Sequence, residues 1–133
     1  MASEPGASDV SGAANMLLIE DRPCLPSEGQ GGGPFSLVEL NALAEGMGRV
    51  RWRQMSDVAQ VVANFARCHP RVREVRYPGL KSDPVFVEAS HTLVGGFGPV
   101  VWCRLEGGRC LRITCFACDP RAACLHLEHH LLT

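Results

Sequence analysis

Charged residues are scarce in this sequence, and neither sign dominates. Asp, Glu, Lys and Arg make up 20% of the 133 residues, and the formal net charge is −1. A nucleic-acid-binding domain carries a clear positive excess, and a disordered chain combines low hydrophobicity with a high net charge. The composition therefore favours a globular protein outside both classes. The basic run 49–76 is compatible with a phosphate-facing surface, but it is more typical of the solvated side of a helix and a strand.

The sequence also lacks the segments that direct a chain into or across a membrane. No apolar run approaches the roughly 20 residues that a membrane-spanning helix needs. The stretch 1–10 contains acidic residues and has no positive region of the kind that begins a secretory signal. We therefore expect a cytoplasmic protein. The seven cysteines are then expected to be reduced thiols that pack as small apolar residues, and not a disulfide framework.

The length fits one domain with a single core. Residues 1–34 are rich in Gly, Ser, Pro and Ala, a composition that predicts a flexible leader. Residues 35–133 are predicted to form a single α+β domain.

Four amphipathic segments predict helices. Ser36 and Glu39 are spaced as in a capping box at the start of the first helix. The second helix is predicted to end at Cys68, because His69 precedes a proline and is driven out of the helical conformation. The third and fourth helices are predicted to begin at Asp-Pro steps, which supply an N-cap and then a proline suited to the first helical position. These steps are Asp83-Pro84 and Asp119-Pro120.

Three shorter segments, 71–77, 97–105 and 110–114, predict strands. The last two are separated by a Gly-Gly turn and are predicted to pair as a hairpin. The order of elements is helix, helix, strand, helix, strand, strand, helix. This order indicates an α+β fold in which helices cover a small, mostly antiparallel sheet.

Several motifs in a fixed order resemble the C-terminal domain of the pyridoxal-phosphate-dependent Cys/Met metabolism (transsulfuration) enzymes, such as cystathionine synthases and lyases and O-acetylhomoserine sulfhydrylases. A helix end with a His-Pro step is followed by V-x-Y-P-G-L, then by G-F-G and a Gly-Gly turn. The matching positions are Ala63, His69, Pro70, Val72, Val75, Tyr77, Pro78, Gly79, Leu80, Gly96, Phe97, Gly98, Gly107 and Gly108. The resemblance covers roughly 35–108 and implies the fold of the C-terminal small domain of fold-type I pyridoxal-phosphate enzymes.

The chain departs from these enzymes where their chemistry lies. They are longer, and an upstream domain holds the cofactor on a lysine in a Ser-x-Thr-Lys context that this sequence lacks. Its only lysine, Lys81, follows the Y-P-G-L motif in a predicted exposed turn, whereas a Schiff-base lysine is desolvated and aimed at the cofactor. The resemblance therefore implies pyridoxal phosphate for the full-length family. For this chain we expect no bound cofactor, and we assign no catalytic, cofactor-binding or metal-binding residue.

The segment 110–130 concentrates thiols and imidazoles. Its first three cysteines have the spacing of plant-type iron–sulfur proteins, but the distant fourth cysteine is missing. A C-x-x-C pair followed by a Cys/His or His/His pair is a possible zinc site, and a C-x-x-C at a helix start is a possible redox motif. The remaining interpretation is that the cysteines belong to the core. The residues concerned are Cys110, Cys115, Cys118, Cys124, His126 and His130.

Three functional hypotheses follow. The first is a non-catalytic packing or oligomerisation module, a truncated homologue that forms a homodimer or binds a separate large-domain chain through an apolar stripe on the second helix. The second is a subunit of a split sulfur amino-acid enzyme, inactive alone, and the third is a small zinc-binding or redox module that uses the cluster Cys110–His130. A degenerate gene product is also compatible, and no nucleic-acid or membrane partner is expected. The stripe consists of Met55, Val58, Val62, Phe65 and Ala66.

Overall fold

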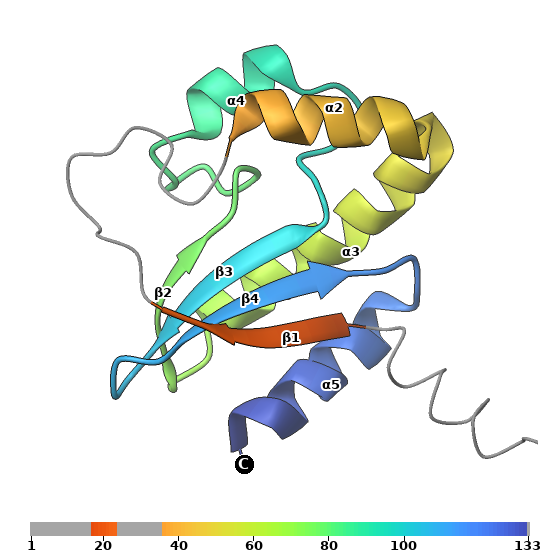
Figure 1. The fold of residues 1–133 in the computed structure, drawn as a ribbon. Coiled ribbons are helices and arrows are strands. Elements are labelled where there is room, and N and C mark those ends of the chain that lie inside the picture. Colours follow the sequence, from red (N-terminus) through yellow and green to blue (C-terminus); the bar gives the residue numbers. More distant parts are fainter. Residues whose placement is uncertain (1–16, 24–35, 133) are drawn as a thin grey trace, which may run out of the picture.

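Two layers make up this computed structural model, which describes residues 17–23 and 36–132 (Figure 1). The helices are α2 (Leu37–Met47), α3 (Arg49–Arg67), α4 (Phe86–Thr92) and α5 (Pro120–Leu132), and the strands are β1 (Leu17–Arg22), β2 (Val72–Arg76), β3 (Val100–Leu105) and β4 (Cys110–Cys115). A four-stranded sheet forms one layer, and α3 and α5 cover one of its faces. Helices α2 and α4 lie together at one end of the sheet (Figure 1).

The predicted α+β fold is confirmed. The strands follow the order β1-β4-β3-β2, and every neighbouring pair is antiparallel. Strands β3 and β4 form the predicted hairpin, and the connection between them contains Gly107 and Gly108. Among the described residues, no helix has both the length and the apolar character to cross a membrane.

The structure differs from the sequence prediction at β1, which lies inside the predicted flexible leader 1–34. Strand β1 pairs with β4 from Leu17 opposite Cys115 to Arg22 opposite Cys110. The physical reason is burial, because Leu17 is 3% exposed and Ile19 packs against the same core. For residues 17–22 the leader prediction is therefore wrong. Residues 1–16 and 24–34 lie outside the described residues, and the division into a leader and a domain otherwise stays a prediction.

The apolar stripe of α3 faces the sheet and not the solvent. Met55, Val58, Val62 and Ala66 are at most 5% exposed, and the half-buried Phe65 packs against the same core. The inner faces of β3 and β4 and one side of α5 complete this core, with Val101, Leu111, Ile113, Cys115, Ala123 and Leu127 all fully buried. The expectation that the stripe is an exposed partner-binding surface is thus wrong, because the domain's own sheet covers it.

Local signals in the sequence set most helix boundaries. Ser36 caps α2, because its Oγ accepts a hydrogen bond from the Glu39 N–H at 3.2 Å. Gly48, with a φ of 95°, separates α2 from α3. Helix α4 begins at Phe86, later than the Asp83-Pro84 signal predicts. The turn before it is closed by the Phe86 N–H and the Asp83 carbonyl oxygen, while the Asp83 side chain binds other groups.

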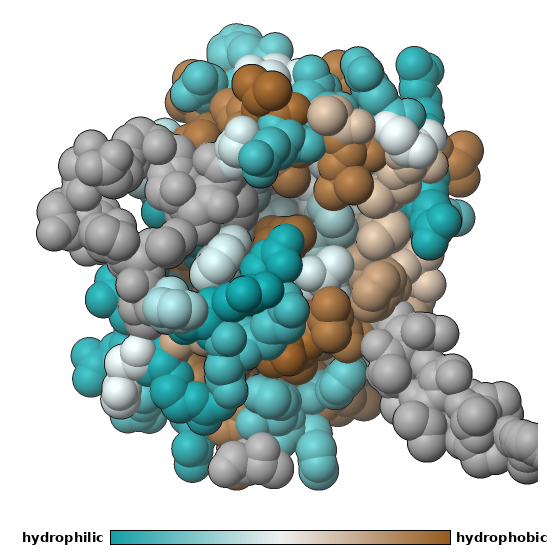
Figure 2. All heavy atoms as spheres, in the orientation of Figure 1, coloured by the Kyte–Doolittle hydropathy of each residue, from teal (hydrophilic) through white to brown (hydrophobic). Residues whose placement is uncertain are grey.

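The outer face of the sheet carries charged side chains. Arg76 lies opposite Trp102, which lies opposite Arg112, which in turn lies opposite Glu20. The last two form an ion pair at 3.1 Å. Figure 2 shows hydrophilic residues gathered over the sheet at the centre of the view. This face therefore carries mainly polar groups, and the most strongly exposed apolar side chains among the described residues, such as Val38 and Val94, lie outside the sheet.

Candidate functional site

Three segments that are distant in sequence meet around the fully buried Tyr77. Its hydroxyl donates a hydrogen bond to the carbonyl oxygen of Gly98 at 2.8 Å, and the carbonyl oxygen of Ser56 is 3.3 Å away. The Oγ of Ser56 accepts a hydrogen bond from the Gly98 N–H at 3.0 Å. Burial raises the pKa of Tyr77 well above its usual range, so the phenol stays a donor. Helix α3, the Y-P-G-L turn and the G-F-G segment are thereby fixed to one another.

Two further side chains of α3 hold the same two segments. Trp52 Nε1 donates a hydrogen bond to the Gly96 carbonyl oxygen, and Gln60 Nε2 donates one to the Gly79 carbonyl oxygen, each at 3.1 Å. Gly96 also approaches α3 so closely that a Cβ on it would overlap the side chain of Ser56. We call these contacts, together with those of the buried tyrosine, the motif lock.

A buried ion pair closes the Y-P-G-L turn on its other side. The side chain of Asp83 is 0% exposed, and its carboxylate accepts hydrogen bonds from Arg76 Nε (2.8 Å) and Nη2 (3.0 Å). The same two oxygens accept the main-chain N–H groups of Tyr77 (3.0 Å) and Val85 (2.9 Å). The hydrogen bond with Asp83 raises the pKa of Arg76, so the guanidinium keeps its charge. Asp83 therefore joins the end of β2 to the start of α4.

His69, in the His-Pro step after α3, connects this end of the helix to α5. The residue is 8% exposed, and its Nδ1 accepts a hydrogen bond from the Arg71 N–H at 3.1 Å. Because Nδ1 is an acceptor, the proton of the neutral ring resides on Nε2, which donates to Glu128 Oε1 at 3.0 Å. The Phe65 ring lies beside the imidazole, with 5.9 Å between the ring centroids. We call this arrangement the histidine latch.

Replacing His69 by alanine is expected to lower the free energy of unfolding by about 1–3 kcal/mol, because it removes a buried ring to which the Arg71 N–H and the partly exposed Glu128 carboxylate are both bound. Chemical denaturation measures this loss. Glu128→Gln is the matched control, since the amide keeps an acceptor oxygen and the effect is expected to stay below about 0.5 kcal/mol. Equal losses in the two variants would contradict the latch.

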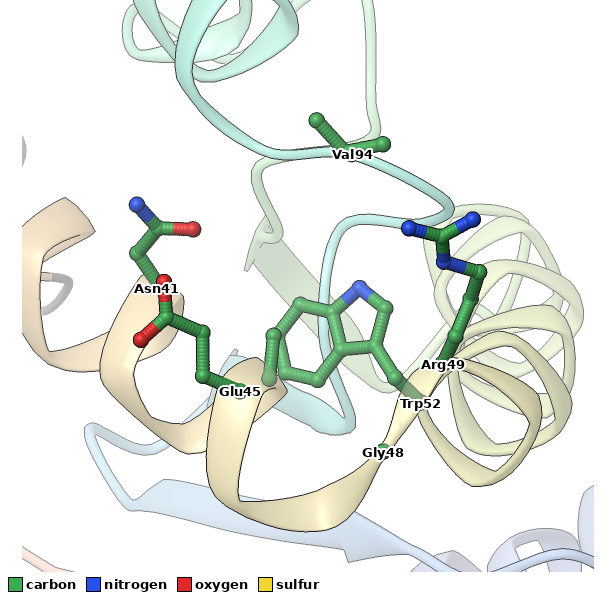
Figure 3. Close-up of a pocket in the computed structure, with 7 residues that line it drawn as sticks. Asn41, Glu45, Gly48, Arg49, Trp52 and Val94 are labelled. Atoms are coloured by element: carbon green, nitrogen blue, oxygen red, sulfur yellow. The ribbon is translucent and has the colours of Figure 1, made fainter.

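A shallow hollow, which we call the cup, opens where α2 meets α3 (Figure 3). It has a volume of about 410 Å³. The Trp52 indole forms its floor, Glu45 and Arg49 stand on opposite sides of the indole, and Val94 lies across from it. Sequence analysis singled out none of these residues. The available signal was the glycine break between the helices, which separates the two charges. The lining residues are Asn41, Ala44, Glu45, Gly48, Arg49, Trp52 and Val94.

The cysteine and histidine cluster is divided between the core and the surface. Cys115 is fully buried beneath the sheet, and burial raises the pKa of its thiol, while Cys118 and Cys124 are half-buried with pKa values also raised by burial. A thiolate is the form that binds metals and attacks disulfides, so these environments oppose both reactions. In the part of the chain that the structure describes, no three ligand-type side chains are grouped as a metal site.

Two further residues of the cluster, His126 and Cys110, differ from these three cysteines in their environment or bonding. Burial lowers the pKa of His126, and the neighbouring His130 and His129 lower it further. Cys110 is disulfide-bonded, whereas Cys68, Cys103, Cys115, Cys118 and Cys124 are free thiols. The prediction of reduced cysteines therefore fails at Cys110, whose place on β4 lies opposite β1, the strand that the sequence did not reveal.

Comparison with known proteins identifies the fold. No family model matches the chain. Cystathionine gamma synthase from Xanthomonas oryzae pv. oryzae, solved with aminoacrylate and cysteine and also with cystathionine, is 16% identical with a TM-score of 0.57, over 62% of this chain and 34% of that chain. An O-acetylhomoserine (thiol)-lyase structure from Campylobacter jejuni is 15% identical with a TM-score of 0.59, over 63% of this chain and 29% of that one. This chain has the fold of one part of the transsulfuration enzymes.

The resemblance inferred from the motifs is therefore confirmed at the level of the fold. The chain spans only 34% and 29% of the lengths of these two enzymes, which is consistent with a C-terminal domain of the transsulfuration enzymes. The motif residues also have an observed use in this chain. Tyr77, Gly79, Gly96 and Gly98 build the motif lock, and His69 builds the latch. In this chain these motif positions hold the fold together.

The residues present do not fit the cofactor of the transsulfuration enzymes. The Campylobacter structure contains N'-pyridoxyl-lysine-5'-monophosphate, in which the pyridoxyl group is joined to a lysine. The only lysine of this sequence, Lys81, is exposed in the turn between β2 and α4. An exposed turn neither desolvates an amine nor aims it at a bound aldehyde. We therefore derive no chemistry through pyridoxal phosphate for this chain.

Proposed function

We propose that this chain is a non-catalytic packing module, a truncated homologue of the C-terminal domain of the transsulfuration enzymes that associates with protein chains and catalyses no reaction alone. The motif lock carries the proposal. Trp52, Gln60 and Tyr77 each donate to a main-chain carbonyl oxygen within the domain. These three side chains thus serve to join α3 to the motif segments.

Partial length supports the same proposal. The matched region is one part of a longer chain in the solved transsulfuration enzymes, and the corresponding surfaces of this domain can be covered by other protein. The partner is a second copy of this chain or a separate large-domain chain, and neither nucleic acid nor membrane. A cytoplasmic location belongs to the proposal. It is supported by the cysteines that form no disulfide, whereas the disulfide of Cys110 counts against a reducing compartment. The cysteines without a disulfide are Cys68, Cys103, Cys115, Cys118 and Cys124.

The second candidate is a subunit of a split sulfur amino-acid enzyme. The coverage of 34% and 29% favours it, because the uncovered length could be supplied by a separate chain that holds pyridoxal phosphate. A zinc or redox module is less well supported, since burial raises the pKa values of Cys115, Cys118 and Cys124 and so opposes thiolate formation.

Association of the purified chain tests the proposal. Analytical ultracentrifugation at tens of micromolar is expected to show a dimer, the commonest closed assembly. The same preparation, incubated with pyridoxal phosphate and dialysed, is expected to retain none of the cofactor by absorbance. Lys81→Ala is the matched control, and its spectrum is expected to be identical.

Two results would contradict the packing module in different ways. A monomer at these concentrations would remove self-association and leave only a separate partner chain. Cofactor retained through dialysis by the natural chain and lost in Lys81→Ala would favour a catalytic role and overturn the non-catalytic assignment.

A further inference from the structure

The two charged side chains of the cup lie on opposite sides of the hollow and form no ion pair with each other. Glu45 and Arg49 are four residues apart, a spacing at which opposite charges on a continuous helix commonly pair. Gly48 interrupts the helix between them, and their side chains stand on opposite sides of the Trp52 indole (Figure 3). Neither side chain has a hydrogen bond or ion pair with another residue in the described ranges 17–23 and 36–132. The cup therefore presents one negative and one positive group that are both available to a partner.

Strongly exposed apolar side chains lie around the same cup. Val94, on its rim, is 76% exposed, and Val38 is 80% exposed. Val38 lies three residues before the lining residue Asn41, so both project from the same side of α2. Exposed apolar side chains beside two charges without a partner among the described residues give this surface the apolar area and the polar groups that protein interfaces combine.

We propose that the cup is the centre of a two-fold interface between two copies of this chain. A two-fold axis makes each contact occur twice with the roles exchanged, so the interface must be complementary to itself. One negative and one positive group on opposite sides of a hollow satisfy this condition. With the axis passing over the Trp52 indole, Glu45 of one copy meets Arg49 of the other, and the reciprocal pair forms at the same time. The exposed Val94 side chains then lie close to the axis.

This inference rests on the proposed packing function and deepens it by naming the partner and the surface. Charge complementarity selects a second copy as the occupant. A partner must place a positive group at Glu45 and a negative group at Arg49. A second copy of this chain already carries both groups, at the positions that a two-fold axis brings together. The alternatives, an unrelated chain or a small zwitterionic molecule in the cup, are outcomes of the experiment that follows.

Charge exchange across the axis tests the interface directly. In a homodimer of the Glu45→Arg variant, the introduced arginine of each copy would repel Arg49 of the other, and in Arg49→Glu the introduced glutamate would likewise repel Glu45. Each variant alone is expected to dimerise at least about tenfold more weakly than the natural chain, since juxtaposed like charges are costly at an interface. An equimolar mixture of the two variants allows a heterodimer. In this heterodimer one copy supplies two arginines and the other two glutamates, so both contacts across the axis join opposite charges. The mixture is therefore expected to form a heterodimer of near-natural affinity, measured by sedimentation with one variant fluorescently labelled.

Arg51→Glu is the matched control. It makes the same change of charge on the same helix at an exposed residue that does not line the cup, and its dimer is expected to keep natural affinity. Thermal unfolding of all variants is expected to match the natural chain, because the substituted side chains are exposed.

The outcomes separate this interface from the packing function itself. A natural dimer that neither variant weakens would overturn the cup interface and leave the packing function standing, with another surface in use. Variants that dissociate but do not recombine when mixed would also overturn it, because the cup would then bind something other than its own copy. A monomeric natural chain would overturn both self-association and the cup interface.

Discussion

Gly96→Ala is expected to lower the free energy of unfolding by about 3 kcal/mol or more. Two costs add at this position. A Cβ on residue 96 would overlap the Cβ and Oγ of Ser56, and these atoms cannot move away because Ser56 is buried on α3 and its Oγ accepts the Gly98 N–H. The backbone also has a φ of 151°, which side chains rarely adopt. Displacing the segment would stretch the hydrogen bond from Trp52 Nε1 to the Gly96 carbonyl oxygen.

Gly107→Ala separates the two costs. Its φ is 92°, also in the region that favours glycine, but no atom lies within 4 Å of the position that a Cβ would take. This variant is expected to lose only the backbone term, about 1 kcal/mol. Chemical denaturation of both variants provides the comparison. Equal losses would show that the close approach to Ser56 contributes nothing.

The elements that the sequence predicts well are those whose signals are local. The Ser36 cap, the helix end before the His-Pro step and the hairpin of β3 and β4 each depend on residues within a few positions of one another. Strand β1 depends on a distant partner, because Leu17 pairs with Cys115. Its short apolar run lies in a Gly-rich and Ser-rich context that resembles a linker. Only the vacant edge of β4 and the core beneath it explain why these residues form a strand.

The stripe on α3 shows a different limit of sequence reasoning. Periodicity places Val58, Val62 and Ala66 on one face of the helix, and the structure agrees. Periodicity does not say which surface covers that face. A sheet of the same domain can bury the apolar face of a helix as well as a partner chain can. The family resemblance favoured a missing large domain as the cover. In the structure two strongly exposed apolar residues at and beside the cup are instead Val94 and Val38, which no periodic pattern connects.

The motif lock could be located from the sequence, whereas the cup could not. Tyr77 and Gly98 belong to motifs that resemblance identifies, so the sequence located the lock without revealing that its role is structural. The cup combines side chains from α2, α3 and the segment after α4, each of an ordinary type in its own stretch. The placement of Glu45 and Arg49 on opposite sides of the cup depends on the angle between α2 and α3 at Gly48. That angle is a tertiary property, and composition and spacing do not contain it.

Asp83→Ala is expected to be as damaging as the glycine substitution, with a loss of about 3–5 kcal/mol in the free energy of unfolding. The carboxylate is fully buried and accepts four hydrogen bonds, two of them from the guanidinium of Arg76. Its removal takes away the carboxylate that this guanidinium contacts most closely, and the Arg76 side chain is only 18% exposed. The Tyr77 and Val85 N–H groups lose their acceptor at the same time, which frees the Y-P-G-L turn from α4.

A comparison with an exposed pair shows whether burial is the cause. Arg53 and Asp57 form an ion pair at 3.3 Å on α3, with side chains 66% and 65% exposed. Asp57→Ala is therefore expected to cost no more than about 0.5 kcal/mol. The double variant Arg76→Met with Asp83→Ala removes both partners of the pair, so it is expected to be less destabilised than the sum of the two single variants. Urea denaturation of these variants beside the natural chain measures this coupling. Strict additivity, or a loss below about 1 kcal/mol in Asp83→Ala, would show that the buried pair does not hold the turn.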